Sequence, residues 1–229
     1  MIPYYSRDGI TIYHGDCRDI LPQLESVDLV LTDPPYNIDF DRNYYSNRKR
    51  KNWSEYVDAP LDYGLLSGEF MRLLQAPASA YICVGYDNYV DWYTAMSAAG
   101  FVYPGYLVWD KGNATWLAGN YGVKWKQRTE LIMHFIKGRP TLAFPDKHNI
   151  LAYNRIAKNE HPCQKPVPLM TELILQSSAL GDLILDPFMG SGTTIVACKQ
   201  LGRQAIGIEK EKDYVEIAVK RLAQEVLAL

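Results

Sequence analysis

The stretch from Leu183 to Glu209 constrains the fold more than any other part of this sequence. It contains an apolar strand ending in Asp186, a Gly-rich turn, a helix, and a second apolar strand ending in Glu209. Two strands joined through a helix run parallel in one sheet, because the helix returns the chain to the starting edge. Strands and helices alternate along most of the chain, so we predict an α/β fold with a mainly parallel twisted sheet. Strands at 106–111 and 129–136 lack room for a long helix between them, so we expect one antiparallel strand.

The Gly-rich turn and the acid after the second strand together suit a nucleoside that carries a carboxylate. Gly190 and Gly192 let the backbone turn tightly and approach a ligand closely. Ser191 and the two threonines after Gly192 can cap the next helix, whose first N–H groups attract a carboxylate. No Gly-Lys-Ser/Thr follows, so the turn is not a P-loop, and the strict dinucleotide fingerprint is also absent. Glu209 lies about 20 residues further on, where an acid commonly holds ribose hydroxyls. S-adenosylmethionine carries both a carboxylate and a ribose.

A second distinctive stretch, Thr32-Asp33-Pro34-Pro35-Tyr36, follows the apolar strand Val27–Leu31. The prolines end that strand because they donate no N–H to a neighbouring strand and fix φ. The resulting rigid turn carries a carboxylate, carbonyl groups and an aromatic ring, which could grip the edge of a planar amine and stack on its face. A plain Pro-Pro turn with a helix-capping Asp would look the same, so these residues alone leave both interpretations open.

Three motifs together resemble those of the amino-methylating DNA methyltransferases. They are Asp33-Pro34-Pro35-Tyr36, His161-Pro162-Cys163-Gln164-Lys165-Pro166 and Asp186-Pro187-Phe188-Met189-Gly190-Ser191-Gly192-Thr193-Thr194. Their order, with the catalytic stretch first and the cofactor loop last, is similar to the circularly permuted β group. The resemblance covers nearly the whole chain and implies a single Rossmann-like, S-adenosylmethionine-dependent methyltransferase domain over residues 1–229. It also implies a role in DNA methylation and restriction–modification.

The resemblance assigns a set of residues that bind the methyl donor. Lys165 and the helix N-terminus would meet its carboxylate, Glu209 its ribose, and Asp186 its ammonium group. Asp16 would hydrogen-bond the adenine amino group beside the Cys17 N–H, although Asp16 could instead only cap the turn that follows it. The whole set is Asp16, Cys17, Lys165, Asp186, Phe188, Gly190, Ser191, Gly192, Thr193 and Glu209.

The resemblance also makes Asp33, Pro34, Pro35 and Tyr36 the catalytic stretch. Asp33 and the Pro34 carbonyl would accept the two hydrogens of an exocyclic amine and offset the charge that develops on its nitrogen. A base stacked in a duplex cannot reach this turn, so it would flip out and stack on Tyr36.

Adenine N6 is the preferred target, because Asp33 stands where many cytosine-directed relatives carry Ser, and because Asn37-Ile38 follows Tyr36. Cytosine N4 is the alternative, since both amines lie beside a ring nitrogen. Two other classes stay open: a catalytically silent nucleic-acid-binding module of the same fold, and methyl transfer to RNA or protein.

Two irregular segments are candidates for DNA contact. Residues 37–60 hold Asn37 and the basic run Arg48, Lys49, Arg50 and Lys51 beside several aromatic residues, which favours a DNA-contacting loop over a merely solvated face. Residues 139–160 form a short, basic candidate target-recognition segment, and a plain surface loop is the alternative. This second segment is too short to fold as a separate domain.

The composition sets further limits. A net charge of −2 argues against a protein coated in positive charge, although it allows a local basic groove. Because the recognition segment is small, we expect a homodimer that widens the DNA-binding surface. The four dispersed cysteines indicate reduced thiols and no metal site. No apolar run has the length of a membrane span and Met1–Tyr5 does not resemble a signal peptide, so we expect a cytoplasmic protein without membrane partners.

Overall fold

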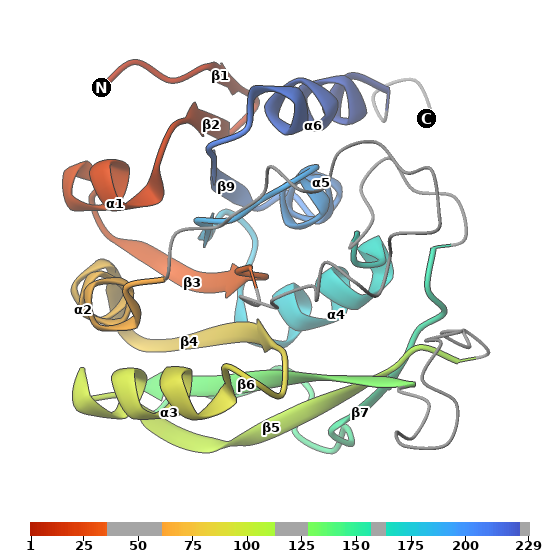
Figure 1. The fold of residues 1–229 in the computed structure, drawn as a ribbon. Coiled ribbons are helices and arrows are strands. Elements are labelled where there is room, and N and C mark those ends of the chain that lie inside the picture. Colours follow the sequence, from red (N-terminus) through yellow and green to blue (C-terminus); the bar gives the residue numbers. More distant parts are fainter. Residues whose placement is uncertain (36–60, 113–127, 157–163, 225–229) are drawn as a thin grey trace, which may run out of the picture.

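The computed structural model describes residues 1–35, 61–112, 128–156 and 164–224. These residues contain one sheet of nine strands in the order β1-β2-β9-β8-β3-β4-β6-β5-β7, which runs from top to bottom in Figure 1. The strands are β1 (Tyr5–Arg7), β2 (Ile10–His14), β3 (Val27–Thr32), β4 (Leu74–Val84), β5 (Val102–Asp110), β6 (Thr129–Lys137), β7 (Ile150–Ala152), β8 (Leu183–Asp186) and β9 (Gln204–Glu209).

The sheet is mainly parallel, as predicted. Strands β2, β9, β8, β3 and β4 pair parallel to one another. Strand β6 pairs antiparallel with both β4 and β5, which confirms the predicted antiparallel strand. A second antiparallel strand, β1, was not predicted; it joins β2 through Asp8-Gly9, whose positive φ values of 53° and 76° suit a tight hairpin turn. The three-residue strand β7 in the candidate recognition segment was also missed.

Helices cover both faces of the sheet. They are α1 (Cys17–Ile20), the 3₁₀ turn η1 (Leu21–Gln23), α2 (Tyr63–Leu73), α3 (Tyr89–Ala98), α4 (Val167–Ser177), α5 (Thr193–Gln200) and α6 (Lys212–Gln224). Alternate residues of β3 serve two cores: Leu29 and Leu31 pack with α4, α5 and α6, whereas Val30 packs with α1, α2 and α3. The helix expected after the Gly-rich turn is present as α5. In the described ranges, no helix is both long and apolar enough to cross a membrane.

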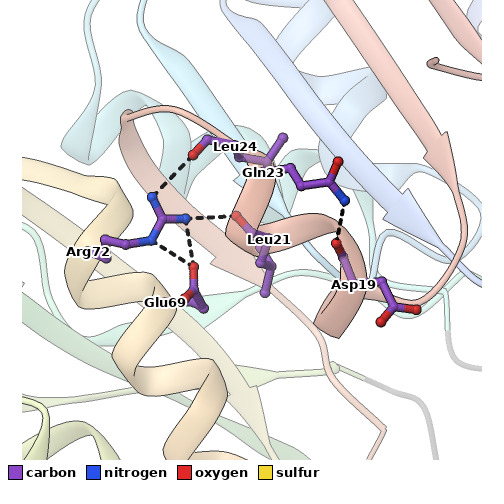
Figure 2. Close-up of polar contacts among 6 residues, drawn as sticks. All are labelled: Asp19, Leu21, Gln23, Leu24, Glu69 and Arg72. Atoms are coloured by element: carbon purple, nitrogen blue, oxygen red, sulfur yellow. Dashed lines mark hydrogen bonds and ion pairs between the residues drawn. The ribbon is translucent and has the colours of Figure 1, made fainter. Parts of the chain in front are cut away.

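One ion-pair cluster, the Arg72 cluster, fastens α2 to the turn before β3 (Figure 2). Arg72 Nη2 donates to the Leu21 carbonyl at 2.8 Å and Nη1 donates to the Leu24 carbonyl at 3.2 Å. Glu69 Oε2 accepts from the same guanidinium at 2.6 Å. These bonds satisfy carbonyl groups at the end of a short helical turn, so the cluster holds one element against another.

Parallel pairing brings the functional motifs to one edge of the sheet. Strands β3, β8 and β9 all end at this edge. Asp33 follows β3, the Gly-rich turn follows β8, and Glu209 is the last residue of β9. Because β6 runs the opposite way, it begins at that edge, and Glu130, its second residue, lies there too. The carboxyl edge of a parallel sheet is where α/β proteins bind their ligands.

Candidate active site

The Gly-rich turn connects β8 to α5 with a backbone that requires glycine. Gly190 and Gly192 have φ values of 50° and 82°, in the left-handed region. A Cβ on Gly192 would also lie 2.7 Å from the Ala218 Cβ of α6. Arg221 of α6 holds the turn from behind: its Nη1 donates to the Ser191 carbonyl at 2.7 Å. The turn is therefore fixed in place at the buried N-terminal end of α5.

Asp186 joins the two motifs of the site. Its Oδ1 accepts a hydrogen bond from Thr32 Oγ1 at 2.9 Å and from the Phe188 N–H at 3.2 Å, and the Thr194 hydroxyl also donates to this carboxyl group. Only 2% of Asp186 is exposed, and this burial raises its pKa to about 7. Because Thr32 directly precedes Asp33, the bond from Thr32 fixes the Asp33 turn beside the Gly-rich turn.

Glu209 ties the end of β9 to the same loop. One of its carboxylate oxygens accepts from the Gly190 N–H at 3.0 Å and the other from the Glu211 N–H at 2.8 Å. Burial raises the pKa of Glu209 above its ordinary value. The acid thus lies beside the Gly-rich turn, where an acceptor for ribose hydroxyls was predicted.

Asp16 is the N-cap of α1, which is the alternative that the sequence left open. Its Oδ1 accepts from the Arg18 N–H and Nε–H, both at 2.9 Å. The hydrogen bond from the Arg18 side chain lowers the pKa of Asp16. A capping carboxylate can also accept from a ligand, so its contact with the cofactor adenine stays a prediction. Burial raises the pKa of Cys17 to about 12, so this thiol is protonated near neutral pH.

A row of four charged groups begins at Asp33. Lys165 Nζ lies 2.5 Å from Asp33 Oδ2 and 3.2 Å from Glu130 Oε2. Lys111 Nζ lies 2.6 Å from Glu130 Oε1. Both ammonium groups lie near the ring of Trp109, at 5.4 Å for Lys111 and 5.9 Å for Lys165. We call Asp33, Lys165, Glu130 and Lys111 the charge row.

The charge row is compensated internally. Lys111 and Lys165 are each only 5% exposed, so their charges need nearby anions. Burial raises the pKa of Glu130, but the positive charges of Lys165 and Lys111 outweigh that effect and hold the pKa below its ordinary value. Lys165 was predicted to meet the cofactor carboxylate. The structure places it against Asp33, and contact with the cofactor stays a prediction.

The candidate target-recognition segment is held against α4 over its described part, 139–156. Phe144 and Gln176 exchange two hydrogen bonds of 2.7 and 2.8 Å between the Phe144 backbone and the Gln176 side-chain amide. Glu172 accepts from Lys147 Nζ at 2.6 Å and from the Tyr153 hydroxyl. Its role in reading DNA stays a prediction.

Some predicted site residues lie outside the described part of the chain. They are Tyr36, Asn37, Arg48, Lys49, Arg50 and Lys51, with the remainder of the loop 37–60 and residues 157–160. Four residues of the site were missed by sequence reasoning: Thr32, Lys111, Glu130 and Arg221. Among the described residues, no group of three or more His, Cys, Asp or Glu side chains could hold a metal ion.

Comparison with known proteins agrees with this geometry. A family model described as "DNA methylase", covering N6 and N4 methyltransferases, matches residues 27–220. This chain belongs to that DNA methyltransferase family. The type II methyltransferase M2.DpnII of Streptococcus pneumoniae is 28% identical over 97% of this chain and 93% of its own length.

Solved structures of family members have the same fold. The M1.HpyAVI complex with S-adenosylmethionine has a TM-score of 0.73 and 30% identity, covering 93% of this chain and 99% of that one. The cytosine-N4-specific PvuII DNA methyltransferase has a TM-score of 0.77 at 20% identity, covering 96% of this chain and 88% of its own. At that identity it supports the fold alone.

The cofactor of this methyltransferase is S-adenosylmethionine, and the site fits that molecule. The Gly-rich turn leaves the first N–H groups of α5 at the ligand-binding edge, where they suit a carboxylate. Glu209 ends the neighbouring strand β9 and supplies an acceptor for hydroxyl groups. A nucleoside with a charged amino-acid arm needs both features.

Proposed function

We propose that this enzyme transfers a methyl group from S-adenosylmethionine to the N6 amine of adenine in DNA. The observation that carries the proposal is the hydrogen bond between Thr32 and Asp186. It holds the Asp33 turn and the cofactor loop on neighbouring strands, so that a methyl donor and a target amine can meet between them.

The residues of the loop would hold the methyl donor. S-adenosylmethionine supplies a methyl group bound to positively charged sulfur. The N-terminus of α5, with Gly190, Ser191, Gly192 and Thr193, binds its amino-acid arm, and Glu209 accepts from its ribose. Asp16, Cys17 and Phe188 surround its adenine, and Lys165 and Asp186 lie toward its charged groups.

Asp33 and the Pro34 carbonyl orient the target amine. The amine is a weak nucleophile, because its lone pair is delocalised into the ring. Two acceptors on its hydrogens turn that lone pair toward the methyl group and offset the positive charge that develops on nitrogen. Pro35 keeps the turn rigid, and Tyr36 stacks on the base.

The base must leave the duplex to reach this turn, so the reaction requires base flipping. We assign phosphate contacts to Asn37 and the basic run from Arg48 to Lys51 and a role in sequence reading to residues 139–160. Reduced, dispersed cysteines and a DNA substrate both suit the cytoplasm.

We also propose a homodimer, which would widen a DNA-binding surface that is small in one subunit. A monomer mass in light scattering at micromolar concentration, with and without DNA, would rule out the dimer.

The second candidate is N4 methylation of cytosine. It is supported by the family model, which covers both N6 and N4 methyltransferases, and by the chemical similarity of the two amines. The acid at Asp33 and the breadth of Tyr36 as a stacking face favour the purine.

The test uses labelled S-adenosylmethionine with long DNA, RNA and a protein mixture as separate substrates. DNA that becomes labelled is digested to nucleosides and analysed by mass spectrometry. We expect N6-methyladenine. N4-methylcytosine as the sole product would establish the second candidate, and label confined to RNA or protein would overturn the proposal.

A further inference from the structure

We propose that Glu130 and Lys111 are positioning residues for Asp33, which they reach through Lys165. This inference rests on the proposed function, in which the Asp33 carboxylate accepts hydrogens of the target amine. In the charge row, negative and positive groups alternate from Asp33 to Lys111. Neither Glu130 nor Lys111 belongs to any of the three sequence motifs.

The topology of the sheet brings these residues to the catalytic turn. Glu130 of β6 is directly opposite Trp109 of β5, and Lys111 comes two residues after Trp109. Side chains at directly opposite positions, and at alternate positions of one strand, share a face of the sheet. The Trp109 ring therefore lies beside both ammonium groups, and its Nε1 donates to the Tyr153 carbonyl at 2.8 Å. The indole is thus held in place beside Lys111 and Lys165 of the charge row.

The charge of Glu130 determines how Lys165 is shared. Lys165 lies between two carboxylates, with the shorter distance to Asp33. Without the charge on Glu130, Lys165 would neutralise Asp33 more completely and weaken it as an acceptor for the amine. Without Lys111, Glu130 would draw Lys165 toward itself and leave Asp33 less firmly oriented. Both changes move the carboxylate from the state that suits the reaction, although neither residue touches a substrate.

The test measures the single-turnover methylation rate of the full-length protein on DNA and, separately, its affinity for S-adenosylmethionine by calorimetry. We expect Glu130→Gln to lower the rate by about tenfold to a hundredfold, a loss typical of small misplacements at a reacting centre. The dissociation constant of the cofactor should change by less than about threefold, roughly 0.65 kcal/mol. Lys111→Met should lower the rate similarly, and Lys111→Arg, which keeps the charge, should recover part of it.

The double variant Glu130→Gln/Lys111→Met distinguishes charge balance from packing. It removes one charge of each sign and keeps the ion pair between Asp33 and Lys165. We expect it to be faster than the product of the two single losses predicts, because the effects of coupled residues do not add. If each substitution only disturbed packing independently, the rate loss of the double variant would equal the product of the two single losses.

The Arg72 cluster offers a matched control (Figure 2). Glu69 and Glu130 are alike in their ion-pair distance of 2.6 Å and in side-chain exposure, 20% and 24%. Glu69→Gln makes the same chemical change on α2, and we expect its methylation rate to stay within about twofold of wild type, as for substitutions away from a reacting site.

Three outcomes are decisive. A slow Glu130→Gln variant with intact cofactor affinity and a normal Glu69→Gln control supports the positioning role. An active wild type with an unchanged Glu130→Gln rate, or a loss that Glu69→Gln reproduces, overturns the positioning role and leaves the proposed function intact. A wild type that methylates no DNA overturns the proposed function and this inference together.

Discussion

Asp33 and Asp186 share a local sequence context but have opposite surroundings. Asp33 follows the buried strand β3, Asp186 ends the buried strand β8, and each precedes a proline. The two strands are neighbours in the sheet. Asp186 is 2% exposed and accepts from two threonine hydroxyls and a backbone N–H. The Asp33 side chain is 23% exposed and lies against the ammonium group of Lys165.

The difference lies in the donors. Hydroxyl groups can rotate and serve as donors or acceptors, so they satisfy a carboxyl group in either protonation state. Such donors suit Asp186, a buried residue that links the two motifs. An ammonium group can only donate, and the Asp33 side chain accepts such a bond from Lys165. This suits an acceptor for amine hydrogens such as Asp33. Asp186 thus holds the site together, and in the proposed reaction Asp33 contacts the target amine.

The largest expected effect comes from making one chemical change at both sites. Asp33→Asn should lower the single-turnover methylation rate by about a hundredfold to ten-thousandfold, the range seen when a positioned catalytic group is lost. Its affinity for S-adenosylmethionine should stay within about tenfold, roughly 1.4 kcal/mol. Asp186→Asn should cost less in rate than Asp33→Asn. Equal rate losses in the two variants would break the comparison.

A second effect concerns stability and pH. Burial raises the pKa of Asp186 to about 7 from an ordinary value near 4, so the folded state holds a proton that the unfolded state releases. Its contribution to stability is present at low pH and is lost as the pH rises through about 7. Between about pH 5 and 8, wild type should lose roughly 3 kcal/mol of unfolding free energy relative to Asp186→Asn.

Denaturant unfolding of both proteins across this range measures that difference. Other titrating groups, including Glu209, contribute equally to both curves and cancel in the subtraction. If the unfolding free energies of the two proteins changed with pH in parallel, Asp186 would be ionised in the folded protein. The contrast between a buried, protonated Asp186 and Asp33 would then be wrong.

The smallest expected effect comes from cutting the link between the two sites. Thr32→Val removes the hydroxyl that donates to Asp186 and keeps the shape of the side chain. We expect a loss of about 1 kcal/mol of unfolding free energy, the usual net value of one such hydrogen bond. Thermal unfolding detects it, with Thr11→Val at a half-buried position of β2 as the control. If both variants unfold alike, Thr32 does not stabilise the joined motifs.

The sequence could predict those parts of the site that lie in contiguous motifs. The strand, acid, Gly-rich turn and helix from Leu183 onward follow one another in the chain, so local chemistry indicates their roles. The charge row could not be predicted in this way. Lys111 and Glu130 are distant in sequence from Asp33, and only the reversed direction of β6 brings Glu130 to the edge where Asp33 lies.

The missed edge strands have different causes. The Asp8-Gly9 pair is a strong hairpin signal, so β1 could have been predicted from it. Strand β7 has only three residues, too few for an alternating pattern to be recognised, and it forms by pairing with β5. The Arg221 contact depends on how α6 packs behind the Gly-rich turn, which no local pattern indicates.

The central claim is that Asp33 accepts a hydrogen of the target amine, and one binding measurement tests it directly. Once the methylated position is mapped, two DNA duplexes are made that carry either adenine or purine without the amine at that position. An abasic site lies opposite it, so that no base pair must break when the base flips out. Wild type, Asp33→Ala and Asp186→Asn, each saturated with S-adenosylhomocysteine, are titrated with both duplexes. Wild type and Asp186→Asn should prefer adenine by about 1.5–3 kcal/mol, the range for a hydrogen bond to a charged group. Asp33→Ala should lose that preference, whereas an unchanged preference in Asp33→Ala would contradict the account.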